Sequence, residues 1–281
     1  MIVDRIVLDN DQQASIFLQQ KLKLSNTDQR ASIISGIVEK SYELMINRFG
    51  NFLMQRCLEY SNASQIASLT ACIIGNVCKL SQDPFGCHVI QKALDCVNEN
   101  MKKIVVEEML ETVTETIVHR YACHVWQKLF ELRWQGTPPK FMDKVNENLK
   151  GMWAQVAIGE TGSLVVQNIF ENCTSDDKDP CIKEVIENID IIIKGQWGNW
   201  VIQHMVEYAK PPYRNQVVAL VIDNSPFYSV DQFASKAVEK LLKMGETDVI
   251  QSFIDKVTEP SNRPRIPLID SKLSKFLTRT E

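Results

Sequence analysis

PFGCHVIQKAL at residues 84–94 and RYACHVWQKLF at residues 120–130 are two copies of one segment. Five related segments accompany them: QQASIFLQQKL (12–22), RFGNFLMQRCL (48–58), ETGSLVVQNIF (160–170), QWGNWVIQHMV (196–206) and QFASKAVEKLL (232–242). The aligned Gln or Glu falls at 19, 55, 91, 127, 167, 203 and 239, in steps of 36 residues except for one step of 40. A period this regular predicts a solenoid, because each unit buries its apolar face only by stacking on its neighbours.

Each segment has the apolar spacing of a helix. In NFLMQRCL, Leu53 and Met54 fall on one helical face, while Asn51, Phe52 and Gln55 fall on the opposite face. The same partition in all seven copies predicts that the apolar columns are core and that the second stripe faces outward. Amphipathic stretches between the segments predict at least two helices and a short third in each repeat, and strand signals are absent.

The residues at helix starts and in the connections between helices also allow predictions. A Gly or Ala opens each segment helix, and we expect it to admit a neighbouring backbone at close range. WQGTPP (134–139) supplies the four extra residues of the longer step and predicts a turn, and TSDDKDP (174–180) predicts a polar loop. TDVIQSFIDKV (247–257) predicts one more helix, followed by a break at EPSNRPRIP and a capping helix over 269–281.

Composition excludes several classes of protein. With 44% apolar and 23% charged residues, the 281-residue chain can fill a core and is not disordered. It has no long uncharged apolar run, so we expect no membrane span, and MIVDRIVLDN does not read as a signal peptide. The eight cysteines form no CxxC pair, which favours reduced thiols inside a cell.

Neither a metal site nor an enzyme is indicated. Cys87-His88 and Cys123-His124 are adjacent pairs, and neighbours on a helix point about 100° apart, so neither pair can hold one ion comfortably. No nucleophile triad, HExxH, P-loop or GxGxxG context appears. We therefore expect no catalysis and no cofactor, and we expect His119 to be structural.

The net charge of −4 conceals a local pattern. The residue after each register position is never acidic: Gln20, Arg56, Lys92, Lys128, Asn168, His204 and Lys240. We expect this column to be locally electropositive and to attract phosphate, with Arg56, Lys92, Lys128, Lys236 and Lys240 as the electrostatic candidates.

The outward stripe holds a triplet in every repeat. In chain order the triplets are Ser15-Ile16-Gln19, Asn51-Phe52-Gln55, Cys87-His88-Gln91, Cys123-His124-Gln127, Ser163-Leu164-Gln167, Asn199-Trp200-Gln203 and Ser235-Lys236-Glu239. Exposed helix positions normally vary, so a column of six Gln and one Glu needs a reason. An amide donates and accepts along the edge of an unpaired RNA base, and a flat ring stacks on its face.

These segments resemble the repeats of the Pumilio (PUF) family, over roughly residues 10–245. The resemblance implies a right-handed superhelical crescent of about six to eight three-helix repeats that binds single-stranded RNA running antiparallel to the chain. Base edges would be read by the first and last members of each triplet, with Ser15 and Gln19 the weakest pair because that repeat could serve only as a cap. Stacking would come from Phe52, His88, His124 and Trp200, with Leu164 in the same position although it cannot stack as a ring does.

The family's code assigns a base to each repeat. Asn with Gln implies U, Cys or Ser with Gln implies A, and Ser with Glu implies G, which agrees with guanine's donors facing an acceptor-only carboxylate. Read 5′ to 3′, the implied site is (G)UAA(A)U(A), with one base open to being skipped.

The resemblance further implies a cytoplasmic protein that binds 3′ untranslated regions of mRNA and recruits effector proteins for translation repression or mRNA decay. We expect a monomer, and binding of more than one copy to one RNA stays an alternative. Two alternatives stay open: a HEAT- or armadillo-like protein-binding scaffold, and a PUF-like factor that grips RNA without reading bases.

We expect residues 1–281 to form a single domain, itself open to being part of a longer protein. Its repeats would lie at about 1–30, 31–66, 67–102, 103–138, 139–178, 179–214 and 215–250, with a degenerate C-terminal cap at 251–281.

Overall fold

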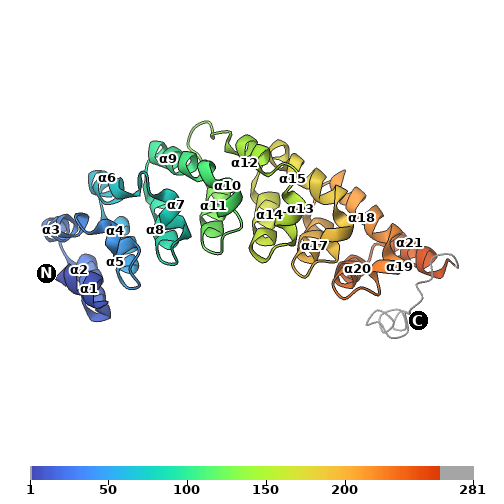
Figure 1. Cartoon of the computed structure of the whole chain (residues 1–281), viewed down its shortest axis with the longest axis horizontal. Helices are drawn as coiled ribbons and strands as arrows, with labels where there is room; N and C mark the ends of the chain where they lie inside the picture. The colour runs from blue at the N-terminus through green and yellow to red at the C-terminus, as the bar shows by residue number, and fades with distance from the viewer. Residues whose placement is uncertain (1, 260–281) are drawn as a thin grey trace. The chain divides into compact units, whose positions relative to one another are not determined.

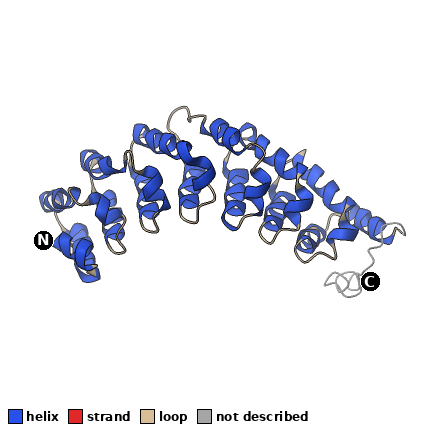
Figure 2. Cartoon of the chain, in the orientation of Figure 1, coloured by secondary structure: helices blue, strands red, loops and turns tan. Residues whose placement is uncertain are grey.

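The computed structural model describes residues 2–259 of the chain. Every regular element of these residues is helical (Figure 2), which confirms the all-α class predicted from the period. The chain divides into two compact units, Met1–Asn148 and Leu149–Glu281. In each unit a repeat consists of a short helix, a segment helix that carries the recurring motif, and an outer helix.

The first unit begins with α1 (Ile2–Asp9), α2 (Gln12–Leu24) and α3 (Thr27–Val38). The next repeats contain α4 (Ser41–Met45), α5 (Gly50–Tyr60), α6 (Ala63–Thr70) and the 3-10 turn Ala71–Ile73, then α7 (Val77–Gln82), α8 (Gly86–Cys96), α9 (Glu99–Met109) and the 3-10 turn Leu110–Thr112. The fourth contains α10 (Val113–Thr116), α11 (Ala122–Glu131) and α12 (Phe141–Leu149). The segment helices α2, α5, α8 and α11 contact one another in turn and form one row (Figure 1).

The second unit repeats this order. It contains α13 (Trp153–Ile158), α14 (Glu160–Asn172), α15 (Ser175–Glu187), α16 (Ile189–Ile193), α17 (Gly198–Tyr208), α18 (Tyr213–Asp223), α19 (Ser225–Tyr228), α20 (Ala234–Lys243) and α21 (Thr247–Thr258). Here α14, α17 and α20 form the row of segment helices, and α15, α18 and α21 form the outer row (Figure 1). Three helices per repeat were predicted, and the structure confirms them.

The predicted apolar columns form the core, except at Phe17 of the first repeat, where the prediction is wrong because its side chain is 44% exposed. Leu53, Met54 and Leu58 are at most 1% exposed, as are Val165 and Val166 at the matching positions of the second unit. Since successive segment helices pack on one another within each unit, these side chains are removed from water by a neighbouring repeat as well as by their own. Burial of an aliphatic side chain stabilises by about 1.5–3 kcal/mol, so this shared core holds the repeats together.

Polar side chains fix the start of the segment helices. Asn47 and Asp83 each accept hydrogen bonds from two backbone N–H groups in the first turn that follows, at 2.7–2.9 Å. Asp231 does the same before α20. In the fourth repeat His119 takes this place, with Nδ1 accepting from the N–H groups of residues 121 and 122 at 3.3 and 3.4 Å. The structural role expected for His119 is therefore confirmed.

The glycine near the start of four segment helices, at residues 50, 86, 162 and 198, is a packing requirement. A Cβ atom on Gly162 would lie 2.1 Å from the carbonyl oxygen of Val156. On Gly50 it would lie 2.7 Å from the carbonyl oxygen of Leu44. Both distances are far below van der Waals contact, so the short helix approaches the segment helix closely only because no side chain is present.

Two outer-helix carboxylates tie successive repeats together. Glu108 on α9 accepts from the N–H groups of Gly75 (2.6 Å) and Val77 (3.1 Å), and Glu184 on α15 accepts from the N–H of Gly151 at 2.9 Å. Both glycines have positive φ, 74° and 79°, and end an outer helix in the left-handed conformation. These contacts fix the angle at which one repeat follows another within each unit.

Two predictions about connections are settled. The turn around 134–139 is confirmed, because residues 132–140 are not helical. The polar loop predicted over 174–180 is wrong: Thr174 caps α15 by accepting from the N–H of Asp177 at 3.3 Å, and acidic residues in the first turn favour the helix dipole despite the internal Pro180.

Of the two helices predicted near the C-terminus, only the first falls within the described residues. The helix predicted over 247–257 is present as α21. The capping helix predicted over 269–281 lies outside the described residues.

Candidate nucleic-acid interface

The second position of the triplet is exposed in six of the seven repeats, and only Ile16 in the first repeat is half-buried. In the first unit Phe52 is 55% exposed, and His88 and His124 are exposed as well. In the second unit Trp200 is 50% exposed and Leu164 is 52% exposed. The exposed rings at residues 52, 88, 124 and 200 therefore present faces on which a planar ligand can stack.

The register glutamines are half-buried and held against their own helices. The Nε2 of Gln55 donates to Oδ1 of Asn51 at 3.2 Å, and that of Gln203 donates to Oδ1 of Asn199 at 2.8 Å. The other bonds of this kind are Gln19 to Ser15 Oγ (3.0 Å), Gln91 to Cys87 O (3.1 Å) and Gln167 to Ser163 O (3.0 Å). Each amide is therefore positioned before any ligand arrives, which lowers the entropy cost of binding.

The first position of the triplet is buried in six of the seven repeats. The exposed fractions of Asn51 and Asn199 are 1% and 0%. The Nδ2 of Asn51 donates to the carbonyls of Asn47 (3.0 Å) and Arg48 (2.9 Å), because in the first turn of the helix these loop carbonyls lie within reach. The expectation that residue 51 faces outward with residues 52 and 55 is therefore wrong. The Asn51 side chain instead positions Gln55 by accepting the hydrogen bond from its Nε2.

The corresponding cysteines are also enclosed. Cys87 and Cys123 are 0% and 2% exposed, and burial raises the pKa of the Cys87 thiol to about 11 and raises that of Cys123. Both thiols are neutral at physiological pH, so they present a small apolar surface beside Gln91 and Gln127. Gln127 differs from the other glutamines, since its Oε1 lies 3.2 Å from Nδ1 of His124.

The seventh repeat is more open. Ser235 is half-buried, and the carboxylate of Glu239 pairs with Lys243 one turn later at 2.6 Å. Lys236 is exposed, with its ammonium 5.4 Å from the ring centroid of Phe233. This repeat therefore offers a carboxylate and a cation where four of the others offer an amide and a ring.

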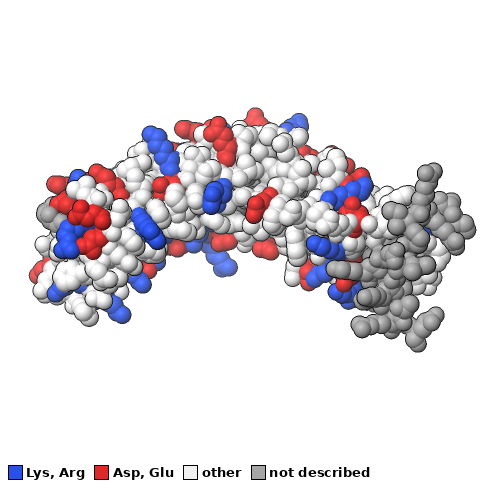
Figure 3. All heavy atoms as spheres, turned by 60° about the horizontal axis from the view of Figure 1, so that its bottom comes forward, with Lys and Arg blue, Asp and Glu red and all other residues white. Residues whose placement is uncertain are grey.

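The basic column forms a ladder of ion pairs between repeats. Lys92 pairs with Glu59 (2.8 Å), and Lys128 pairs with Asp95 (2.6 Å). Lys240 pairs with Glu207 in the same way (2.6 Å), while Arg56 pairs with Glu59 within α5, and Nε2 of His204 lies 2.9 Å from Oε1 of Glu171 in the preceding repeat. Hydrogen bonding to Lys92 lowers the pKa of Glu59, so the pair is charged at neutral pH. The positive charge expected along this column is offset by acids. Figure 3 shows Lys and Arg interspersed with Asp and Glu over the face in view.

Two exposed arginines, Arg48 and Arg120, were not among the electrostatic candidates predicted from the sequence. The guanidinium of Arg48 lies 5.4 Å from the ring of Phe49, and that of Arg120 lies 4.7 Å from the ring of Tyr121. Among residues 2–259, neither is in an ion pair with a carboxylate. The signal was present as the arginine-aromatic pair that opens RFGNFLMQRCL and RYACHVWQKLF. These cations lie beside the segment helices and can meet a phosphate.

No helix within the described part of the chain is long and apolar enough to cross a bilayer. The sequence matches the Pumilio-family RNA binding repeat (PUF) over residues 10–38, 40–74, 76–110, 114–132, 153–186, 188–222 and 228–258. Most of these matched segments begin near the short helix of a repeat.

Similar proteins extend the comparison. The chain is 49% identical over 194 residues to "Meiotic coiled-coil protein 2" of Schizosaccharomyces pombe (strain 972 / ATCC 24843), covering 69% of this chain and 28% of the relative. It is 40% identical over 261 residues to "Meiotic PUF family protein 1" of the same organism, covering 93% of this chain and 45% of the relative. It thus spans less than half the length of both relatives. The structure of the Puf3 RNA binding domain bound to a Cox17 RNA 3′ UTR recognition sequence superposes with a TM-score of 0.83 at 25% identity, covering 99% of this chain and 86% of that one.

Proposed function

Because the chain belongs to the Pumilio (PUF) family of RNA-binding repeat proteins, we propose that it binds single-stranded RNA and reads successive bases with successive segment helices. The observation that carries this proposal is the recurring pair of an exposed ring and a positioned amide, as in Phe52 with Gln55 and Trp200 with Gln203. A ring stacks on the face of any base, while an amide held in one orientation distinguishes base edges.

The buried first residue decides what the glutamine can offer. In the second and sixth repeats one N–H of the glutamine Nε2 donates to an asparagine oxygen, and this bond orients the amide so that Oε1 can face the ligand as an acceptor. Uracil presents an N3–H donor, so these repeats are assigned to U. In the repeats with Cys87 or Ser163 the glutamine is bonded only to a helix carbonyl, from which Nε2 can turn to the N1 acceptor of adenine.

The proposed site is 5′-(G)UAA(A)U(A)-3′, bound antiparallel to the chain. From the C-terminal end, the readers are Ser235/Glu239, Asn199/Gln203, Ser163/Gln167, Cys123/Gln127, Cys87/Gln91, Asn51/Gln55 and Ser15/Gln19. Glu239 suits guanine, whose N1–H and amino group are donors that its carboxylate oxygens can accept. Arg48, Arg120 and Lys236 would contact phosphates, with the ion-paired Arg56, Lys92, Lys128 and Lys240 contributing where RNA displaces a carboxylate.

The cellular role follows from the same reasoning. The Puf3 domain is seen with a 3′ UTR sequence, which supports an mRNA 3′ untranslated region as the target of this chain. Binding there would recruit effector proteins that repress translation or promote mRNA decay in the cytoplasm. The chain would act as a monomer on each site.

A selection from random RNA tests the proposal, because it reports site length, skipped bases and the status of G together. Variants Phe52→Ala and Trp200→Ala remove exposed rings and should each weaken binding roughly 5- to 150-fold, the worth of one stacked base. Ile191→Ala is the matched control, since Ile191 is 62% exposed on α16 and belongs to no triplet. Recovery of unrelated sequences, or equal affinity of all three variants and wild type, would refute base reading by this face.

A further inference from the structure

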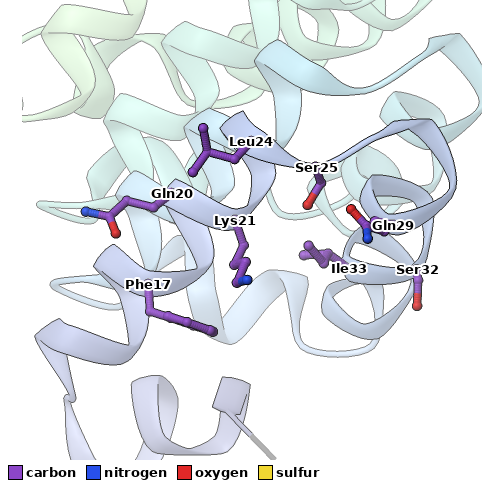
Figure 4. A pocket seen from close by; sticks show the side chains of 8 residues that line it. All are labelled: Phe17, Gln20, Lys21, Leu24, Ser25, Gln29, Ser32 and Ile33. Carbon is purple, nitrogen blue, oxygen red and sulfur yellow. The ribbon is translucent and has the colours of Figure 1, made fainter.

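A cavity of about 470 Å³ lies at the first repeat of the Met1–Asn148 unit, between α2 and α3. Phe17, Gln20, Lys21 and Leu24 line it from α2, and Gln29 and Ile33 line it from α3 (Figure 4). Cavities of this size accommodate small ligands such as a nucleoside.

Phe17 is unusual for its place in the repeat. The residues at the same register in the next three repeats, Leu53, Val89 and Val125, are 0% exposed, because each packs in the core. Phe17 is 44% exposed and Leu24 is 82% exposed. A solvent-facing phenyl ring contributes little to stability, and clustered exposed apolar groups mark binding surfaces.

The chemistry of the lining favours a nucleotide. The ammonium of Lys21 lies 5.6 Å from the centroid of the Phe17 ring, so a cation and an aromatic face are available side by side. Gln20 is exposed on the same helix. Gln29 lines the cavity from α3, and the Oε1 of Gln29 also accepts from the N–H of Asn26 at 3.4 Å. A ring for stacking, a cation for phosphate and an amide for a base edge are the groups that proteins use to hold single-stranded nucleic acid.

The cavity continues the surface of the first triplet. Phe17 and Gln20 follow Ile16 and Gln19 directly along α2, so their side chains lie about 100° around the same helix. A strand whose last base were read at Gln19 would continue past Gln20, the next residue around α2, toward this cavity. We propose that the cavity between α2 and α3 binds the nucleotide that follows the base read at Gln19. This inference rests on the proposed function and, with antiparallel RNA, concerns the 3′ end.

The experiment compares RNA ending at the core with RNA carrying one or two further nucleotides at either end. Affinities are measured by fluorescence anisotropy for wild type, Phe17→Ala, Phe17→Tyr and Leu8→Ala. Leu8 is 76% exposed on α1 and lies outside the cavity, so it controls for loss of an exposed apolar side chain. An RNA whose added nucleotide is abasic separates attraction of the phosphate from binding of the base.

We expect extension at the 3′ end to strengthen binding roughly tenfold in wild type, Phe17→Tyr and Leu8→Ala, but not in Phe17→Ala. An equal gain from the abasic nucleotide, or an equal gain in Phe17→Ala, would overturn the base-binding cavity while leaving core recognition standing. Loss of a protein partner from Phe17→Ala with an unchanged gain from RNA extension would assign the cavity to protein docking and overturn it too. Absence of binding to the core RNA would instead refute the proposed function.

Discussion

Replacing Asn199 by Ser and Gln203 by Glu is expected to change the base preferred by the sixth repeat from U to G. The double variant reproduces the pair found at residues 235 and 239 in the seventh repeat. It exchanges an amide acceptor, positioned by Asn199 at 2.8 Å, for a carboxylate that accepts both donors of guanine. Base-edge pairs of this kind discriminate by about 1–3 kcal/mol, which corresponds to a swing of roughly 5- to 150-fold for each base.

The structure also gives the costs of this change. The carboxylate introduced by Gln203→Glu would lie one turn before Glu207, a like-charge arrangement that lowers helix stability by about 0.2–0.5 kcal/mol. Asn199 donates to the carbonyls of Gly195 and Gln196 at 3.0 and 2.8 Å. Ser can retain the second bond, as Ser163 does with Glu160 at 3.0 Å, so we expect a loss of stability of about 1–2 kcal/mol without unfolding.

The assay is a competition between RNAs that carry U, G or A at the matching position. Asn199→Ser alone is the control, because it keeps the glutamine and should shift preference toward A. Circular dichroism and thermal unfolding verify the fold of each variant. Equal weakening for all three RNAs in a folded double variant would show that residues 199 and 203 do not read this base.

Three further outcomes are expected. Gly162→Ala should destabilise the chain by at least about 1–3 kcal/mol, because its Cβ would clash with a backbone carbonyl at 2.1 Å, whereas Gly36→Ala has no atom within 4 Å and should stabilise by about 0.4–1 kcal/mol in the same urea titration. Asn51→Ala should lower the free energy of unfolding by about 1–3 kcal/mol, since it leaves two carbonyls without their donor, while Asn51→Ser should lower it less; equal urea midpoints would contradict this. Hydrogen bonding to Lys92 lowers the folded-state pKa of Glu59, so the contribution of this carboxylate to the free energy of unfolding is present above its unfolded pKa of about 4.3 and is lost as the pH falls through the folded-state pKa. Wild type should therefore lose more stability than Glu59→Gln between about pH 6 and pH 3, and parallel losses would argue against the pair.

Much of the fold could be read from periodicity, because period and helix geometry are local properties. The 36-residue step predicted stacked three-helix repeats, and the apolar spacing around Leu53 and Met54 predicted the core. The same spacing placed Phe52 and Trp200 on the surface, where the structure finds them. The polar segment 174–180 was assigned wrongly, because a capping threonine and first-turn acids outweigh a proline that local propensity treats as a break.

Other features depend on what the neighbouring repeat and the preceding loop contribute. Helix geometry puts Asn51 and Gln55 on one side of the helix. Only the folded structure shows that Asn51 is buried by its hydrogen bonds to two loop carbonyls, whereas Gln55 stays accessible to a ligand. The pairing of Lys92 with Glu59 joins residues 33 positions apart, so composition along one helix could not show that this charge is offset. The sequence by itself determined the repeat, its core and its outward rings, because these follow from side-chain spacing along one helix. Which polar groups remain available to RNA was decided by tertiary packing, because a polar group's availability depends on the partners that surrounding elements place within hydrogen-bonding distance.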